Sequence, residues 1–238
     1  MKMNKLGAAI IAATVTLTGA TTTYAHEAGD FIIRAGAATV APKDSPNNNV
    51  DQISALGAGS NIEADNDTQL GLNFVYMLTD NFGLEVLAAS PFEHDIQVSL
   101  SGVEGVTGIP DGKYDVGSTK QLPPTVSLQY YMLDKTSKVR PYVGLGINYT
   151  MFFDQSSSGP FDNLDLDDSM GISAQVGVDV MVTDQILFNA SAYRMDIDTD
   201  ATVDLNVPGG AAAGQTLRLT SDVTIDPMVY MVSVGYKL

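Results

Sequence analysis

A strict alternation of apolar and polar residues constrains the fold of this chain more than any other feature. It is clearest from Met228 to Leu238, where every second side chain is aliphatic or aromatic. Alternation of this kind predicts an extended strand whose two faces meet different surroundings. Because a soluble domain usually ends in a frayed polar tail, an apolar stripe through the last residue favours a strand that faces lipid and pairs with a neighbour.

The same period-two pattern recurs in eight segments of the chain. An even number of such strands predicts an all-β fold, an eight-stranded antiparallel transmembrane barrel. The connections alternate between long and short, which is typical of bacterial outer-membrane barrels with long extracellular loops, short periplasmic turns and both mature termini on the periplasmic side. The predicted strands span 30–40, 68–79, 82–92, 122–133, 139–153, 169–182, 186–198 and 226–238, and the predicted long loops span 41–67, 93–121, 154–168 and 199–225.

Parity within each predicted strand assigns the side chains to a lipid face or a lumen face. In the third strand, Leu84 and Val86 fall on the lipid side and Glu85 on the lumen side. A lipocalin-like soluble barrel would require the reverse, with the apolar stripe inside, so the membrane barrel is favoured. Arg194 has lipid-side parity, which requires either a position at the headgroup level or a bulge that changes the register. The polar residues predicted to face the lumen are Arg34, Glu85, Gln129, Asn148, Gln175, Asp179 and Lys237.

The first 25 residues have the organisation of a secretory signal peptide. Lys2 and Lys5 precede an apolar stretch, and small and polar residues follow it up to Ala25. The apolar stretch is shorter than the roughly 20 residues that a membrane-spanning helix needs. We therefore expect residues 1–25 to be removed and residues 26–238 to form a single barrel domain. The chain has no cysteine, which excludes disulfides and thiolate metal sites.

The composition argues against several classes of function. The net charge of −16 and the scattered basic residues disfavour nucleic-acid binding. His26 and His94 are the only imidazoles, and the acidic neighbours of His94 point to the opposite face of a strand, so we expect no catalytic residues, no enzyme activity and no cofactor. An acidic cluster in the third long loop could offer oxygen ligands to calcium or magnesium, but solvated loop acids explain it more simply and no metal site is predicted. Its members are Asp162, Asp165, Asp167 and Asp168.

Several sequence stretches together carry a resemblance to a known family. They include HEAGDF from His26, GLEVLAASPF from Gly83, LPPT from Leu122 and RPYVGLGINYT from Arg140. With these stretches the chain resembles the outer membrane protein W family of eight-stranded barrels over nearly its whole mature length. The resemblance implies a Gram-negative outer-membrane protein surrounded by lipid and lipopolysaccharide.

The resemblance also implies a narrow, largely hydrophobic channel for small apolar molecules, and an exposed surface used by bacteriocins. Members of the family close the channel with an apolar constriction, to which the motif match assigns Leu87 and Met170. Parity agrees for Leu87, which has lumen-side parity. Parity places Met170 on the lipid side with Ile172, unless a bulge intervenes.

Two hypotheses for function follow. The first is a passive outer-membrane channel through which small apolar solutes pass an apolar throat that includes Leu87. The alternative is a closed structural or receptor barrel whose loops bind a bacteriocin, a phage or a host surface, because the interior of an eight-stranded barrel is only wide enough for its own side chains.

Overall fold

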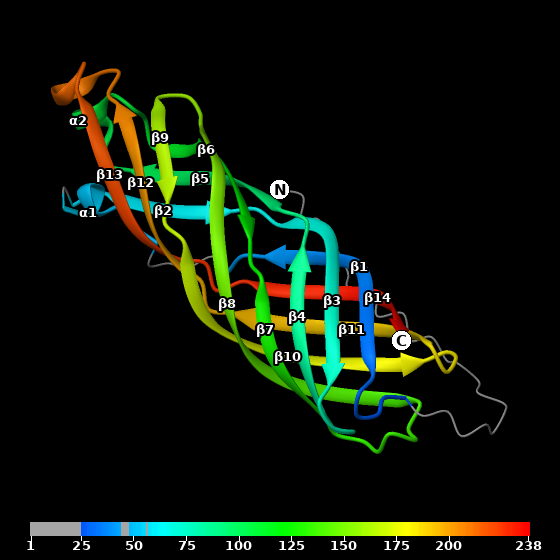
Figure 1. Ribbon diagram of the computed structural model, residues 1–238. Helices are drawn as coiled ribbons and strands as arrows, with labels where there is room; N and C mark the ends of the chain where they lie inside the picture. Colours follow the sequence, from blue (N-terminus) through cyan, green and yellow to red (C-terminus); the bar gives the residue numbers. More distant parts are fainter. Residues whose placement is uncertain (1–24, 44–47, 56) are drawn as a thin grey trace, which may run out of the picture.

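The computed structural model describes residues 25–43, 48–55 and 57–238. The molecule is elongated, with a closed barrel at one end and a β-sheet extension continuing from it at the other (Figure 1). The predicted signal peptide lies outside the described residues except for Ala25. None of the helices in the described part of the chain is long and apolar enough to cross a membrane.

Eight antiparallel strands close the barrel, as the sequence predicted. Each strand pairs with its neighbour along the wall, β8 pairs with β10, and β14 pairs with β1 to complete the circle. The last strand therefore pairs with the first, as closure of the predicted barrel requires. The barrel strands are β1 (Phe31–Ala41), β3 (Asp67–Met77), β4 (Phe82–Ala89), β7 (Thr125–Tyr131), β8 (Val139–Ser157), β10 (Ser169–Met181), β11 (Ile186–Met195) and β14 (Met228–Lys237).

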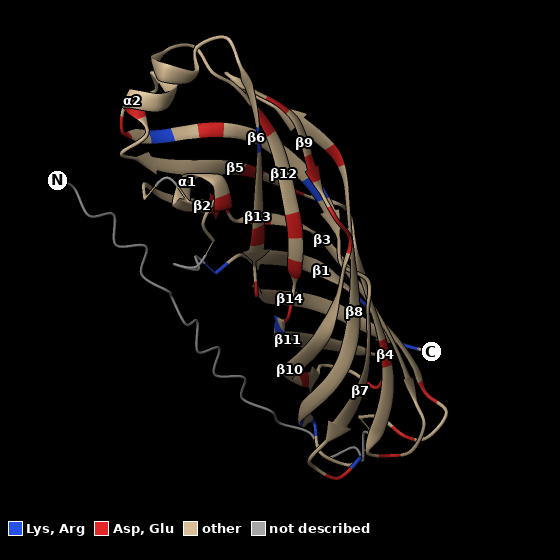
Figure 2. Ribbon diagram, turned by 90° about the vertical axis from the view of Figure 1, so that its left-hand side faces the viewer, with Lys and Arg blue, Asp and Glu red and all other residues tan. Residues whose placement is uncertain are grey.

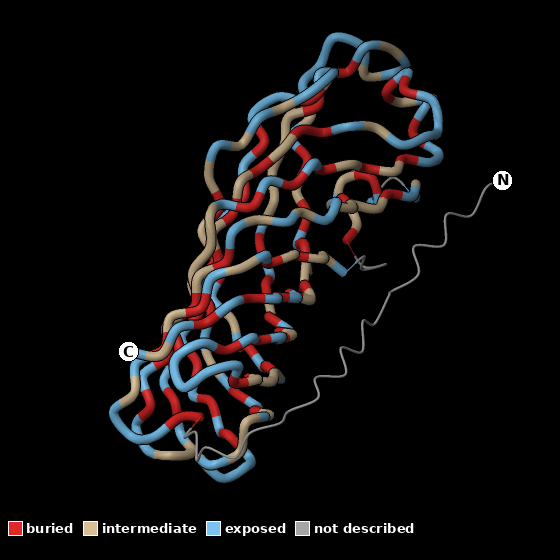
Figure 3. The backbone as a smooth tube through the Cα atoms, turned by 90° about the vertical axis from the view of Figure 1, so that its right-hand side faces the viewer, coloured by how far each residue is buried: buried red, intermediate tan, exposed pale blue. Residues whose placement is uncertain are grey.

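Exposed and buried residues alternate along the strands of the barrel wall (Figure 3). On β8, Leu145 and Ile147 are 67% and 61% exposed, whereas the next residue, Asn148, is fully buried. The outward side chains of the neighbouring strands are likewise large, apolar and exposed, and charged residues are sparse along the middle of the barrel (Figure 2). An apolar surface of this extent requires lipid rather than water around it.

The extension consists of strands that continue above the barrel. One group, β6, β5 and β2, adds to the upper part of β8, and a separate three-stranded sheet has the order β13-β12-β9. The short helices α2 and η1 lie together at the far tip (Figure 1). The elements are β2 (Gly59–Ala64), β5 (Phe92–Ser101), β6 (Gly112–Leu122), β9 (Phe161–Leu166), β12 (Asp198–Asn206), β13 (Thr216–Thr224), α1 (Asp51–Ala55), α2 (Glu104–Thr107) and η1 (Gly210–Ala212).

The prediction that the four long connections are loops is therefore wrong for much of their length. The turn residues that suggested loops lie between the new strands, for example Gly102 and Gly108 around α2, and both have positive φ. Between those turns the alternation of polar and apolar residues continues, but its orientation is reversed. The polar residues now face outward and the apolar residues inward.

Two strand boundaries differ from prediction for a local reason. The predicted third strand divides at Ser90 and Pro91, where β4 ends and β5 begins, and β7 starts only at Thr125, after Pro123 and Pro124. Proline has no N–H to donate to a strand ladder, so it interrupts pairing at these points.

Arg194 lies on the outer face of the barrel at the end next to the extension. It is opposite Met228 in the β11–β14 register, and no register shift occurs in either ladder of β11. Its guanidinium is 3.2 Å from the carboxylate of Asp226. The bulge proposed to explain the lipid-side parity of Arg194 is therefore wrong. The charge of Arg194 is instead accommodated by an ion pair at the rim of the barrel.

Candidate functional site

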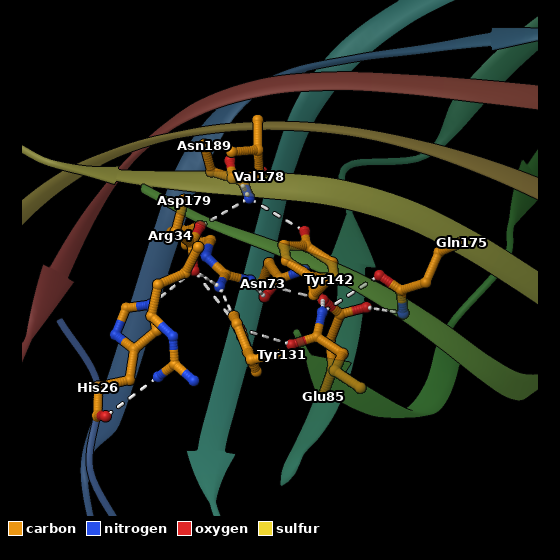
Figure 4. Close-up of polar contacts among 12 residues, drawn as sticks. His26, Arg34, Asn73, Glu85, Tyr131, Tyr142, Gln175, Val178, Asp179 and Asn189 are labelled. Carbon is orange, nitrogen blue, oxygen red and sulfur yellow. Dashed lines mark hydrogen bonds and ion pairs between the residues drawn. The ribbon is translucent and has the colours of Figure 1, made fainter. Parts of the chain in front are cut away.

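The lower half of the barrel lumen is filled by a network of buried polar side chains (Figure 4). At its centre Arg34 donates hydrogen bonds to Asp179, to the hydroxyl of Tyr131 (2.8 Å) and to the Oδ1 atom of Asn73 (3.1 Å). These four side chains come from β1, β10, β7 and β3, so the contacts cross the lumen. Burial without such partners would strongly destabilise the guanidinium.

The second carboxylate of the network is Glu85 on β4. It accepts hydrogen bonds from Asn73 (2.5 Å), Gln175 (2.9 Å) and Gln129, and its Oε2 atom lies 3.6 Å from Nη1 of Arg34. Tyr193 approaches both carboxylate oxygens at 3.4 Å. Every one of these side chains is at least 97% buried, so the carboxylate is held by protein groups on all sides.

The network is closed at the short-turn end of the barrel by His26 and Arg140. The Nε2 atom of His26 lies 2.8 Å from the carboxylate of Asp179. The backbone carbonyl of His26 accepts a hydrogen bond from Arg140 at 3.1 Å. Arg140 also donates to the carbonyls of Asp80 and Leu133 and lies over the ring of Tyr131 at 4.9 Å. The lumen here contains two buried guanidiniums and two buried carboxylates, so the formal charges balance.

A different kind of interior lies above this network, in the extension. The inner faces of its two sheets enclose a cavity of about 80 Å³ whose walls are mainly aliphatic and aromatic. Apolar walls and few polar groups are typical of sites that bind small molecules. The apolar lining residues include Val50, Ile62, Ile96, Val98, Leu100, Val116, Phe152, Phe161, Leu164, Leu166, Val203, Leu219 and Val223.

The polar lining of the cavity includes a short hydrogen-bonded chain. His94 on β5 donates a hydrogen bond from Nδ1 to the backbone carbonyl of Asp65 at 2.7 Å. The side-chain amide of Gln121 on β6 donates a hydrogen bond to Nε2 of His94 at 2.9 Å. His94 is 3% exposed and Gln121 is 1% exposed. The Oε1 atom of Gln121 is buried without a hydrogen-bond partner in the described structure.

An interruption in the barrel wall lies between the cavity and the polar network. The β4–β7 ladder ends at the pair Leu87–Thr125, and the β5–β6 ladder begins at the pair Phe92–Gln121. Residues 88–91 and 122–124 fall between these pairs and contain three prolines. The wall therefore lacks a ladder directly above the pair Leu87–Thr125.

The predicted lumen residues occupy the following positions. Arg34, Glu85, Gln129, Gln175 and Asp179 form the network described above, and Asn148 is buried nearer the extension, where it donates to Thr150 at 3.1 Å. Lys237 lies at the opposite end, 3.4 Å from Asp30.

The two predicted constriction residues lie on opposite sides of the wall. Leu87 is 5% exposed and belongs to the apolar cluster inside the molecule. Met170 is 76% exposed on the outer face, opposite the outward Tyr149. The assignment of Met170 to the constriction is therefore wrong, because simple alternation continues to the start of β10 and turns its side chain away from the lumen.

The acidic residues of the third connection are exposed on β9 and the segment after it. Asp168 accepts hydrogen bonds from the hydroxyl of Tyr149 (2.7 Å) and the amide of Phe152, and Asp162 accepts one from Asn206. Asp165 and Asp167 lie between them. Within the described ranges, no group of three or more His, Cys, Asp or Glu residues is arranged to hold a metal ion.

Sequence reasoning missed two parts of the site. The first is the contact between His26 and Asp179, which are 153 positions apart and share no local signal. The second is the cavity wall, for which a signal existed: His94, Ile96, Val98 and Leu100 alternate with polar residues along one segment. That segment satisfies the period-two criterion for a strand.

Comparison with known proteins places the chain among outer-membrane barrels. The model of the OmpW family matches residues 27–238. The chain is 44% identical over 242 residues to outer membrane protein W of Vibrio cholerae, with all of both chains covered. The crystal structure of the outer membrane protein OprG from Pseudomonas aeruginosa superposes with a TM-score of 0.75 at 40% identity and covers 90% of this chain and 98% of that one. A more distant relative, at 25% identity over 74% of each chain, is the dibenzothiophene metabolism operon protein PahQ of Pseudomonas aeruginosa.

Proposed function

Because this chain belongs to the OmpW family of outer-membrane β-barrel proteins, we propose that it passes small apolar molecules across the outer leaflet of the outer membrane. The observation that carries the proposal is the apolar cavity inside the extension. An apolar solute leaves water when it enters such a cavity, so partition alone drives binding, and no cofactor or chemical step is needed.

The orientation follows from the same proposal. The extension faces the cell exterior, while the short turns, the start of β1 and the end of β14 face the periplasm. Outer-membrane barrels generally have their short turns on the periplasmic side. In this arrangement residues 1–25 direct export and are removed, which leaves 26–238 as the mature barrel.

The exit that the geometry favours is sideways into the membrane. The route toward the periplasm is occupied by the Arg34, Asp179 and Glu85 network, and displacing buried ion pairs with an apolar molecule would leave charges without partners. The interrupted ladder beside Leu87 lies above that network and below the cavity. A solute that moves from the cavity past Leu87 and through this interruption reaches lipid without crossing a charged layer.

The name of one relative supports the class of solute. PahQ is named for an operon of dibenzothiophene metabolism, and dibenzothiophene is an apolar aromatic compound. A protein of this kind would admit such compounds past the polar lipopolysaccharide surface, and ions would pass poorly.

The test is the uptake of radiolabelled n-octane by vesicles with a lipopolysaccharide outer leaflet, with and without the protein. We expect faster entry with the wild-type protein. Ile96→Lys, which places an ammonium in the cavity wall, and Leu87→Arg, which places a guanidinium at the throat, should abolish the difference. Gln97→Lys is the matched control, because Gln97 follows Ile96 on β5 but bonds to Asp115 outside the cavity.

Equal uptake with and without the protein would overturn the channel proposal. A receptor role for the extension would then be the better explanation of a barrel whose lumen is closed.

A further inference from the structure

We propose that the cavity selects amphipathic molecules that have a neutral hydrogen-bond donor at one end, with primary alcohols as the simplest class. The inference rests on the proposed function, since it concerns the same cavity. It assigns a specificity-determining role to Gln121, whose Oε1 atom accepts the hydrogen bond of the ligand, and a positioning role to His94.

The first step of the argument is the orientation of the Gln121 amide. The carbonyl of Asp65 can only accept a hydrogen bond, so Nδ1 of His94 donates it. The atom of Gln121 that faces Nε2 of His94 at 2.9 Å is the amide nitrogen, which can only donate, so Nε2 accepts this hydrogen bond. The backbone of Asp65 thus fixes the amide through His94 and directs Oε1 away from the imidazole.

The second step is the state of that oxygen. Gln121 is 1% exposed and lines the cavity, and its Oε1 atom has no hydrogen-bond partner among the described residues. Buried polar atoms are satisfied in the great majority of cases, and an unsatisfied one is destabilising. A ligand that brings an O–H group to this position replaces the missing partner, whereas a hydrocarbon leaves the oxygen unsatisfied.

The third step is the place of the acceptor within the cavity. Gln121 pairs with Phe92 in the first rung above the interrupted ladder, at the barrel end of the cavity. Apolar side chains line the cavity farther along β5 and on the opposite sheet, including Val98, Leu100 and Leu164. A ligand with its head at Gln121 would therefore extend its alkyl tail along these walls.

The fourth step is the charge of the head group. Among the described lining residues, Lys43 is the only Lys or Arg, and Glu63 carries the opposite charge. A carboxylate at Gln121 would oppose the Oε1 lone pairs. The site therefore fits a neutral donor better than a fatty-acid anion.

The experiment compares two photoreactive probes that differ only at the head. Both have a ten-carbon chain with a mid-chain alkyl diazirine, and one ends in a hydroxyl and the other in a methyl ether. Wild-type protein in lipid nanodiscs is irradiated over a range of probe concentrations, and mass spectrometry quantifies labelling of the cavity-lining residues. We expect the half-saturating concentration to be about fivefold lower for the alcohol, the effect of one net hydrogen bond.

The variant Gln121→Met keeps the length of the side chain and removes the acceptor, so it should make the two probes equal. Gln97→Met, the same change on the outer side of β5, should leave the fivefold preference unchanged. Equal labelling of the wild-type cavity by both probes would overturn the inference and leave the apolar channel standing. If neither probe labels the cavity residues, the cavity is not a binding site, and both proposals fail. The wild-type comparison requires no variant, so poor folding of Gln121→Met would not prevent the test.

Discussion

The barrel and the extension are both hollow β-structures, yet their interiors have opposite character. Inside the barrel, buried guanidiniums, carboxylates and amides fill the lumen and pair with one another. Inside the extension, aliphatic and aromatic side chains surround open space. The barrel interior is therefore filled by paired polar groups, whereas the extension interior contains an apolar cavity.

Strand β8 shows the cause of this difference, because it runs through both regions. In the barrel, its outward residues Leu145 and Ile147 are apolar and its inward residue Asn148 is polar and buried. In the extension, the inward residue is Phe152 and the outward Asp154 pairs with Lys120. The surroundings therefore set the phase of the alternation: lipid outside requires polar side chains inside, and water outside permits an apolar interior.

The largest expected effect comes from breaking the polar network inside the barrel. Asp179→Leu would remove the carboxylate that bonds to Arg34 and to the imidazole of His26, and would leave Arg34 with Glu85, at 3.6 Å, as its remaining carboxylate. We expect a loss of about 3–5 kcal/mol in the free energy of unfolding, the usual result of removing one partner of a buried ion pair. Urea unfolding in lipid vesicles, followed by circular dichroism, measures it.

A double variant separates loss of the ion pair from loss of packing. Arg34→Met together with Asp179→Leu removes both charges and should recover part of the lost stability. A loss below about 1 kcal/mol for Asp179→Leu, within the range of a surface pair, would show that the network does not seal the barrel.

The sequence predicted the barrel better than the extension, and the phase of the alternation explains why. In the barrel segments an outer apolar stripe such as Leu84 and Val86 repeats in strand after strand, so both strand number and facing could be read from parity. In the segments after Ser90, glycines and prolines at the turns suggested loops and hid the strands between them. Parity also placed the charges of Arg34, Glu85 and Asp179 together in the lumen, where buried charges need partners. The individual contacts could not be predicted, because 145 positions separate Arg34 from Asp179 and only the closed register brings them together.

The second-largest expected effect is on octane uptake and comes from bridging the interruption in the wall. Cysteines at Ala88 and Pro124, joined by a short bifunctional thiol reagent, would bridge the segment where the ladder is absent. Protein-dependent octane uptake should be lost and should return when a reducible linker is cleaved. Since the chain has no native cysteine, the reagent acts only at these sites.

The matched control for this bridge is the pair Val86→Cys and Val126→Cys. These residues are already partners in the intact β4–β7 ladder, so a link between them should not change uptake. Loss of uptake with the control link as well would show that rigidity of the wall, rather than closure of the interruption, is responsible.

The third effect concerns the open space in the extension. Val98→Phe would fill part of the cavity, and we expect octane uptake to fall severalfold with a change in stability below about 1.5 kcal/mol, because the added ring enters existing space. Val98→Ile adds a single methylene and should give an intermediate rate. A stability loss of more than about 3 kcal/mol would instead indicate that the wall is as tightly packed as an ordinary core.

The smallest effect lies on the water-facing side of the extension, where two carboxylates oppose each other across a ladder. Asp200 pairs with Asp222 in the β12–β13 register, and the hydrogen bond and repulsion between them raise the pKa of Asp200. Since the raised pKa belongs to the folded state, protonation stabilises this sheet, and that stabilisation is lost as the pH rises through the folded-state pKa. Amide hydrogen exchange on β12 should therefore be slower at pH 4 than at pH 7 after correction for the intrinsic rate.

Asp222→Asn removes the repulsion and should abolish this difference between the two pH values. The effect should be small, because water screens charges on an exposed face. Two carboxylates could not face each other in this way inside the barrel. There Glu85 and Asp179 are enclosed by hydrogen-bond donors, whereas Asp200 and Asp222 can face each other because water surrounds them. An unchanged pH dependence in Asp222→Asn would assign the effect to other acids of the extension and leave this contrast without support.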